Sequence, residues 1–141
     1  MRNGSDIFVR IDPGEEIHAA IRAVCTAEDV TAAAITSGVG RTHTTEIGYL
    51  DDEGVYHRRL HEAPMELVSI QGNFALYDGA PFTHLHAMFA DDDLVPHGGH
   101  LFQTTVHMVA EVHIRVLGEG AVYPMSRCAM PDNEFVRLEF S

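Results

Sequence analysis

The stretch Thr105-Val106-His107-Met108-Val109-Ala110-Glu111-Val112-His113-Ile114-Arg115-Val116-Leu117 alternates between apolar and polar side chains. Because successive residues of a β-strand point to opposite faces, the pattern predicts one long strand with a wholly apolar face. The residues predicted for that face are Val106, Met108, Ala110, Val112, Ile114 and Val116. We expect solvent, a subunit interface or a pocket to cover the other face. That face carries His107, Val109, Glu111, His113 and Arg115.

Other strand patterns lie on both sides of this stretch and are separated mostly by short turns. They are predicted at residues 7–11, 31–37, 45–50, 55–60, 65–77, 82–90 and 134–140. Gly38-Val39-Gly40 reads as a tight turn after the second of these strands, and Asp78-Gly79-Ala80-Pro81 as the turn of an antiparallel hairpin. Gly72 lies inside a predicted strand and indicates a bulge or a close backbone approach.

One helix is predicted after the first strand. Asp12 is its expected N-cap, with Pro13 at the first helical position and Glu15 at the third. Apolar residues then recur at helical spacing and form one face, made of Ile17, Ala20, Ile21, Val24 and Cys25. A strand and a helix followed mostly by strands predict an α+β fold. We expect a single domain over residues 1–141, in which one or two helices flank a predominantly antiparallel β-sheet.

The chain is acidic, with nine basic residues, all arginine, against twenty-one acidic residues and a formal net charge of -12. This charge repels phosphate backbones and opposes direct nucleic-acid binding. No run of about 18 apolar residues indicates a membrane span. The first six residues are polar rather than a secretion signal, and Cys25 and Cys128 show no paired spacing. We therefore expect a cytoplasmic protein.

A histidine motif offers the clearest chemistry in the sequence. His84 and His86 stand at strand spacing, so their imidazoles should share one face, and Gly98-Gly99 predicts a turn that brings His100 back towards them. Three neutral imidazoles can bind zinc or another divalent transition metal and leave an open position for water or a ligand. The spacing leaves open an alternative, in which the histidines are polar strand residues hydrogen-bonded to each other and to buried water.

Glu111 is the carboxylate that the pattern places best for proton transfer, because it shares a strand face with His107 and His113. The pattern favours a simpler alternative, in which Glu111 pairs with Arg115 or is a solvated residue of the sheet. The G-x-S-x-G motif of serine hydrolases and the lysine-containing phosphate loop are both absent from the sequence.

Several of these motifs together resemble the PPC (plants and prokaryotes conserved) domain over residues 7–117. The most specific part of the resemblance is the pair Pro81-Phe82-Thr83-His84-Leu85-His86 and Gly98-Gly99-His100-Leu101. The other matching segments are Gly14-Glu15-Glu16-Ile17, Ser37-Gly38-Val39-Gly40, Gly48-Tyr49, Glu66-Leu67-Val68-Ser69-Ile70-Gln71-Gly72-Asn73 and Ala110-Glu111-Val112. Thr104 stands where the family usually has glycine, and residues 118–133 do not align with the family.

The resemblance implies an α+β domain that assembles as a homotrimer. It also implies that His84, His86 and His100 lie close together, in a kind of cluster with which metal has been associated. A bound metal would activate water or polarise a carbonyl, with Glu111 as a proton shuttle, or the site would capture a small-molecule ligand. Neither the substrate nor the metal follows from the resemblance. A purely structural role for the histidines stays open.

The family also suggests a second function, that of a DNA-binding protein or a regulator in a DNA-bound complex. Bacterial members are often described in this way because plant relatives carry AT-hook arms, with Arg-Gly-Arg-Pro-like sequences that enter the minor groove. No such arm occurs in this sequence. We therefore expect any DNA association to act mainly through protein contacts.

Overall fold

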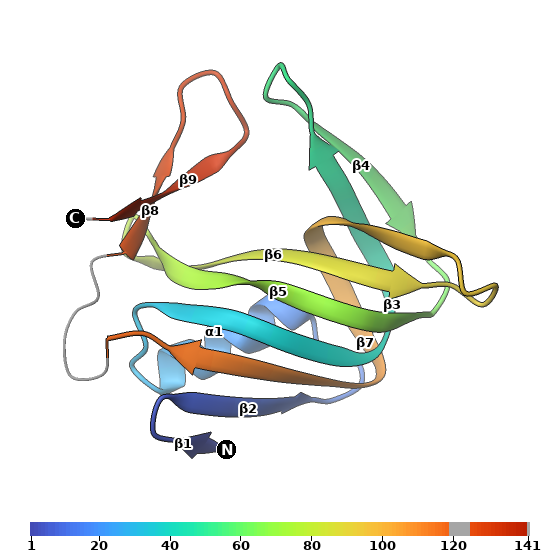
Figure 1. Cartoon of the computed structure of the whole chain (residues 1–141), viewed down its shortest axis with the longest axis horizontal. Helices are drawn as coiled ribbons and strands as arrows, with labels where there is room; N and C mark the ends of the chain where they lie inside the picture. The colour runs from blue at the N-terminus through green and yellow to red at the C-terminus, as the bar shows by residue number, and fades with distance from the viewer. Residues whose placement is uncertain (119–124, 141) are drawn as a thin grey trace.

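The computed structural model describes residues 1–118 and 125–140, which form a twisted sheet with one helix packed against it (Figure 1). The helix, α1, spans Ile17–Ala27. The strands are β1 Arg2–Asn3, β2 Asp6–Ile11, β3 Ala33–Leu50, β4 Tyr56–His61, β5 Met65–Tyr77, β6 Ala80–Ala90, β7 Pro96–Val116, β8 Met125–Ala129 and β9 Val136–Phe140. No helix in this described part is long and apolar enough to cross a membrane.

The sheet order is β1-β2-β7-β3-β5-β8-β9, with β4 paired to β3 and β6 paired to both β5 and β7. Every strand pairing is antiparallel except the short parallel one between β5 and β8. The predicted α+β class with a predominantly antiparallel sheet is therefore confirmed. Of the two strands nearest the C-terminus, β9 falls within the predicted strand, whereas β8 was not predicted.

The main core lies between α1 and the sheet. Ile17, Ile21 and Cys25 of the helix are fully buried, as the helical spacing predicts. The helix begins later than predicted, because its N-cap is Glu16 and not Asp12. Gly14, with φ 88°, interrupts the expected helical backbone, and the Glu15 carboxylate instead accepts a hydrogen bond from the Asp12 N–H at 2.8 Å.

Two glycine motifs predicted as turns lie inside long strands instead. Gly38-Val39-Gly40 continues β3, and Gly98-Gly99 continues β7. A Cβ added at Gly40 would lie 2.3 Å from the carbonyl oxygen of Val109, and one at Gly99 would lie 2.5 Å from that of Gly48. These glycines are therefore required by the close approach of neighbouring strands, and their prediction as turns is wrong.

A bulge in β7 changes the face on which Met108 lies. Arg41 of β3 pairs with Val109, but the next residue, Thr42, pairs with Val106. Two extra residues of β7 therefore stand between these pairs and interrupt the alternation locally. Met108 is 62% exposed, so its assignment to the apolar face is wrong, whereas the other five residues predicted for that face are buried.

The strands β3, β5, β6 and β7 form a closed ring of pairings, in which each strand is bonded to the next and β7 returns to β3. The ring closes because the first residues of β7 pair with β6, while residues of β7 from His100 onward pair with β3. Four shifts of register between β3 and β7 accompany this curvature. β6 and β7 form an antiparallel hairpin with its turn at residues 91–95, so the first residues of β7 lie beside the second half of β6 and His100 reaches the middle of β6 at His86.

Candidate metal centre and its cavity

His84, His86 and His100 meet at the seam between β6 and β7. The backbone register pairs His86 directly with His100, and His84 precedes His86 by two residues on the same face of β6. The three ring centroids are 5.0–5.3 Å apart, and one nitrogen from each ring lies within 4.8 Å of the others. The structure thus brings together the three imidazoles of the sequence motif through the antiparallel β6–β7 hairpin, whose turn lies at residues 91–95 rather than at Gly98-Gly99.

The donor set of this cluster fits a transition metal. Zinc bonds to imidazole nitrogen are 2.0–2.1 Å long, so tetrahedral ligands stand roughly 3.3 Å apart. Nitrogens within 4.8 Å of one another can reach that separation by small side-chain rotations. Neutral imidazole suits zinc, copper, iron and nickel, while calcium and magnesium prefer oxygen ligands.

Burial keeps two of these histidines neutral. It lowers the pKa of His84 to about 4, with further contributions from Arg127 and His86. Burial also lowers the pKa of His100 to about 3, helped by the neighbouring His84 and His86. His86 is exposed at the rim of the cluster. At neutral pH His84 and His100 therefore each have an unprotonated nitrogen, as metal coordination requires.

One contact competes with coordination by His84. The guanidinium of Arg127 lies 3.1 Å from Nδ1 of His84, and because a guanidinium only donates, Nδ1 accepts this hydrogen bond. The neutral ring then carries its proton on Nε2. Coordination through Nδ1 would displace the Arg127 guanidinium from that nitrogen. Coordination through Nε2 would place the ring proton on Nδ1, where this N–H would face the N–H of Arg127 and no hydrogen bond could form. A metal bound to neutral His84 therefore requires release of this hydrogen bond.

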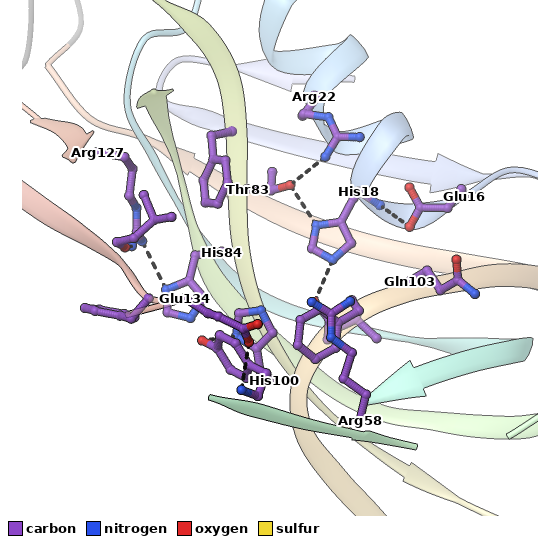
Figure 2. Close-up of a pocket in the computed structure, with 16 residues that line it drawn as sticks. Glu16, His18, Arg22, Arg58, Thr83, His84, His100, Gln103, Arg127 and Glu134 are labelled. Carbon is purple, nitrogen blue, oxygen red and sulfur yellow. Dashed lines mark hydrogen bonds between the residues drawn. The ribbon is translucent and has the colours of Figure 1, made fainter. Parts of the chain in front are cut away.

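The cluster opens into a cavity of about 680 Å³, a volume within the usual range for small-molecule sites (Figure 2). One wall is formed by buried His18 of α1. Its Nε2 donates to the carbonyl oxygen of Leu101 at 3.0 Å, so its Nδ1 accepts from the hydroxyl of Thr83 at 2.7 Å. Burial lowers the pKa of His18, which fixes this neutral arrangement.

The opposite wall comes from β4 of the β3–β4 hairpin and from the segment around β8 and β9; the hairpin and this segment face each other in Figure 1. The Glu134 carboxylate accepts a hydrogen bond from the Tyr56 N–H at 2.8 Å and joins the two parts. The Tyr56 hydroxyl lies 3.4 Å from Nδ1 of His100, and the two rings pack at 4.7 Å. Tyr56 therefore supports the orientation of the His100 ring.

Sequence reasoning missed most of the polar residues around the cavity, which are Glu16, His18, Arg22, Tyr56, Arg58, Gln103, Arg127 and Glu134. They come from α1 and its N-cap, from β4, β7 and β8, and from the loop after β8. No spacing rule links such distant segments. The sequence carried a signal for one of these residues, because His18 follows Ile17 at the start of the predicted buried face of the helix.

The structure does not bring Glu111 to the histidine cluster. It is exposed on β7, where its backbone stands opposite Arg10 of β2 and Val39 of β3 in the strand register. It does not line the cavity. The ion pair predicted between Glu111 and Arg115 is also not formed, because Arg115 pairs with Asp6 at 3.0 Å. Glu111 is therefore a residue of the outer sheet face.

Comparison with known proteins identifies the family of this chain. The sequence profile of the Plants and Prokaryotes Conserved (PCC, also written PPC) domain matches residues 1–118. The chain belongs to this family. The prediction from the histidine and glycine motifs is therefore confirmed, and the match ends where the sequence resemblance also ends. No curated protein sequence matched the chain.

Several solved structures share the fold. A PPC protein from Pyrococcus horikoshii is 30% identical, with a TM-score of 0.80 over 92% of this chain and 87% of that one. A protein from Archaeoglobus fulgidus, described as metal-containing, is 28% identical, with a TM-score of 0.81 over 92% and 89% of the two chains. A protein from Bacteroides thetaiotaomicron, provisionally described as DNA-binding, is 20% identical, with a TM-score of 0.86 over 99% and 95%. The last likeness shows the fold alone.

Proposed function

We propose that this PCC protein binds zinc or another divalent transition metal through His84, His86 and His100. The observation that carries the proposal is the convergence of three ring nitrogens within 4.8 Å at the edge of a cavity. A relative 28% identical to the chain is described as metal-containing, which supports it. Bound metal would have an open position at which it could activate water or polarise a carbonyl of a small molecule.

The surrounding residues would orient the ligands and hold the small molecule. Tyr56 and Phe102 both pack against His100, with ring centroids 4.7 Å and 4.6 Å from that of the imidazole, and they also contact each other at 5.1 Å. His18 and Thr83 form a hydrogen-bonded wall deeper in the cavity. The proposal gives Glu111 no step at this site, because Glu16 and Glu134 are the carboxylates that line the cavity.

Metal content tests the proposal most directly. Protein purified without an affinity tag should contain close to one metal ion per chain by elemental mass spectrometry, and His86→Ala should lose it. Because His86 is exposed, its removal should leave the fold intact. The control is His57→Ala, which removes an exposed strand histidine that pairs with Asp51 at 2.6 Å, outside the cluster.

Each outcome of this comparison is decisive. Loss of metal in His86→Ala but not in His57→Ala supports the site. Equal metal content in all three proteins, or none in the wild type after growth with added zinc, would refute it. A purely structural role for the histidines predicts a lower melting temperature in the variant without any change in bound metal.

We also propose that the protein is a homotrimer, as its family resemblance implies. Large apolar side chains are exposed on the sheet face away from α1, which supports burial of that face by another copy. Phe8 on β2 is 63% exposed, Val39 on β3 is 52% exposed and Met108 on β7 is 62% exposed. Sedimentation velocity tests this, and a monomer at micromolar concentration would contradict it.

An alternative is a role in a DNA-bound complex. Its support is the provisional description of structural neighbours that are 20% and 17% identical, and such similarity shows the fold alone. The formal net charge of -12 opposes direct contact with DNA. A gel-shift assay at low salt tests direct binding under the conditions that favour it most, and we expect no shift.

A further inference from the structure

Three of the nine arginines of this acidic chain line the cavity beside the histidine cluster. Arg22 comes from α1, Arg58 from β4 and Arg127 from β8, and they surround the cavity in Figure 2. In a protein with a formal net charge of -12, acidic partners for surface guanidinium groups are plentiful. The hydrogen-bond and ion-pair partners of these three guanidinium groups therefore indicate what kind of molecule the cavity could bind.

None of the three forms an ion pair with a carboxylate within the described residues. The other arginines mostly do, as in Arg2–Glu28, Arg10–Asp12, Arg41–Glu66, Arg115–Asp6 and Arg137–Glu139. Arg22 donates one hydrogen bond, from Nη1 to the Thr83 hydroxyl at 3.3 Å. Arg58 stacks its guanidinium over the ring of Phe102 at 3.8 Å, which leaves the edge of the group free to donate.

Arg127 is buried and donates to neutral acceptors, the carbonyl oxygen of Val136 at 2.7 Å and Oδ1 of Asn73 at 2.6 Å. Its Nε is buried and has no hydrogen-bond partner among the described residues. An orphaned donor on a buried charge is costly, and it commonly marks a position that a ligand or water completes.

The two carboxylates that line the cavity are already engaged by main-chain N–H groups. Glu16 caps α1, where its oxygens accept from the N–H groups of His18 at 3.0 Å and Ala19 at 2.7 Å. Glu134 accepts from the N–H of Tyr56 at 2.8 Å. Neither carboxylate forms an ion pair with the cavity arginines, which therefore keep an excess of positive charge at this site.

Aromatic side chains supply the rest of the wall. Phe82 and Phe102 both line the cavity, and the guanidinium of Arg127 lies 5.7 Å from the Phe82 ring centre. Guanidinium groups next to flat apolar surfaces suit a molecule that carries both an anionic group and a planar or apolar part.

We propose that the cavity binds a small organic anion, with its carboxylate or phosphate group held by Arg22 and Arg58 and its apolar part against Phe82 and Phe102. This inference rests on the proposed function in one respect, since it names the class of substrate that the metal site would act on. The anion contacts themselves do not require metal, so the two proposals can fail separately.

NMR titration of the uniformly ¹⁵N-labelled full chain tests this inference with three probes: benzoate, phenyl phosphate and the neutral benzyl alcohol. At least one of the two anions should shift the amide signals of Thr83 and Phe102 saturably, and benzyl alcohol at the same concentrations should not. The two anions distinguish a carboxylate site from a phosphate site. Because a charged hydrogen-bond pair contributes about tenfold or more to affinity, Arg58→Gln should weaken anion binding by at least about tenfold.

The control is Arg59→Gln. Arg59 neighbours Arg58 on β4 and also has no carboxylate partner within the described residues, but it does not line this cavity. It should bind the anions like the wild type, and Arg58→Lys should recover part of the affinity lost in Arg58→Gln. Arg58 is exposed, so these variants should remain folded.

Metal content measured on the same samples separates the two proposals. Arg58→Gln should lose anion affinity and keep its metal. No saturable shift by either anion, or equal anion affinity in wild type and Arg58→Gln, would overturn the inference whatever the metal content. Metal-free protein that still binds benzoate or phenyl phosphate through Arg58 would uphold the anion site and refute only the metal proposal.

Discussion

Replacing Gly72 by alanine should push β5 away from β6, the strand that carries His84. Gly72 lies on β5 and pairs with Leu85 of β6. A Cβ at this position would stand 1.9 Å from the carbonyl oxygen of His84 and 3.0 Å from the Cα of Leu85. Both neighbours are backbone atoms, so no side-chain rotation can relieve the contact.

The size of the effect follows from this geometry. Carbon–oxygen contacts between strands are normally no shorter than about 3.3 Å, so β6 must move away by about 1.4 Å at His84. Overpacking and the weakened hydrogen bonds around it should together cost about 2–4 kcal/mol of unfolding free energy, or roughly 5–12 °C in Tm. The movement is more than half the length of a zinc–imidazole bond, so zinc affinity should fall at least about tenfold.

Guanidinium chloride unfolding followed by circular dichroism measures the first effect, and zinc competition with a chromophoric chelator measures the second. The control is Gly79→Ala in the β5–β6 turn, where an added Cβ would meet no atom within 4 Å. Because Gly79 has φ 77°, this control should cost about 1–2 kcal/mol but leave zinc affinity unchanged. A Gly72→Ala protein as stable as Gly79→Ala, with wild-type zinc affinity, would refute the reasoning.

Three further predictions follow from buried groups. Burial raises the pKa of the Cys25 thiol to about 12, so an alkylating reagent at pH 8 should modify only the exposed Cys128 in the folded protein; mass spectrometry showing two modified thiols would contradict this. Thr104→Val removes a buried hydroxyl that lies 2.6 Å from the hydroxyl of Thr45, and denaturant unfolding should show a loss of about 1–2 kcal/mol. Metal-free protein should lose stability as pH falls from about 6.5 towards 4. The reason is that half-buried His84 and His100, with pKa values of about 4 and about 3, take up protons in this range mainly in the unfolded chain. Denaturant unfolding midpoints unchanged between pH 7 and pH 4.5 would count against it.

Local periodicity was enough to predict most elements of this fold. The strand predicted at 65–77 matches β5 at both ends, and the helix face containing Ile17, Ile21 and Cys25 is buried as expected. Such predictions succeed because each depends on residues a few positions apart, whose relative directions are set by the backbone of one strand or one helix. The motifs also identified the PCC family, because they combine specific residues over most of the chain.

The glycine motifs and Met108 show where prediction from neighbouring residues in the sequence fails. A glycine lacks a Cβ whether it serves a turn or allows another strand to approach, and Gly40 and Gly99 serve the second purpose. Their neighbours are Val109 and Gly48, which only the pairing of β3 with β7 reveals. The bulge that exposes Met108 likewise depends on how β3 aligns with β7, a register that the alternation of one strand cannot contain.

By itself, therefore, the sequence determined most of the elements, the fold class, the family and the identity of the three candidate ligands His84, His86 and His100. The tertiary structure alone decided how the ligands meet, through the register of the β6–β7 hairpin that sets His100 opposite His86, and which residues stand around them. Arg58 and Arg127 reach the same cavity from β4 and β8. These two arginines line one cavity only because distant strands pack together, and that proximity is set by the register and curvature of the whole sheet.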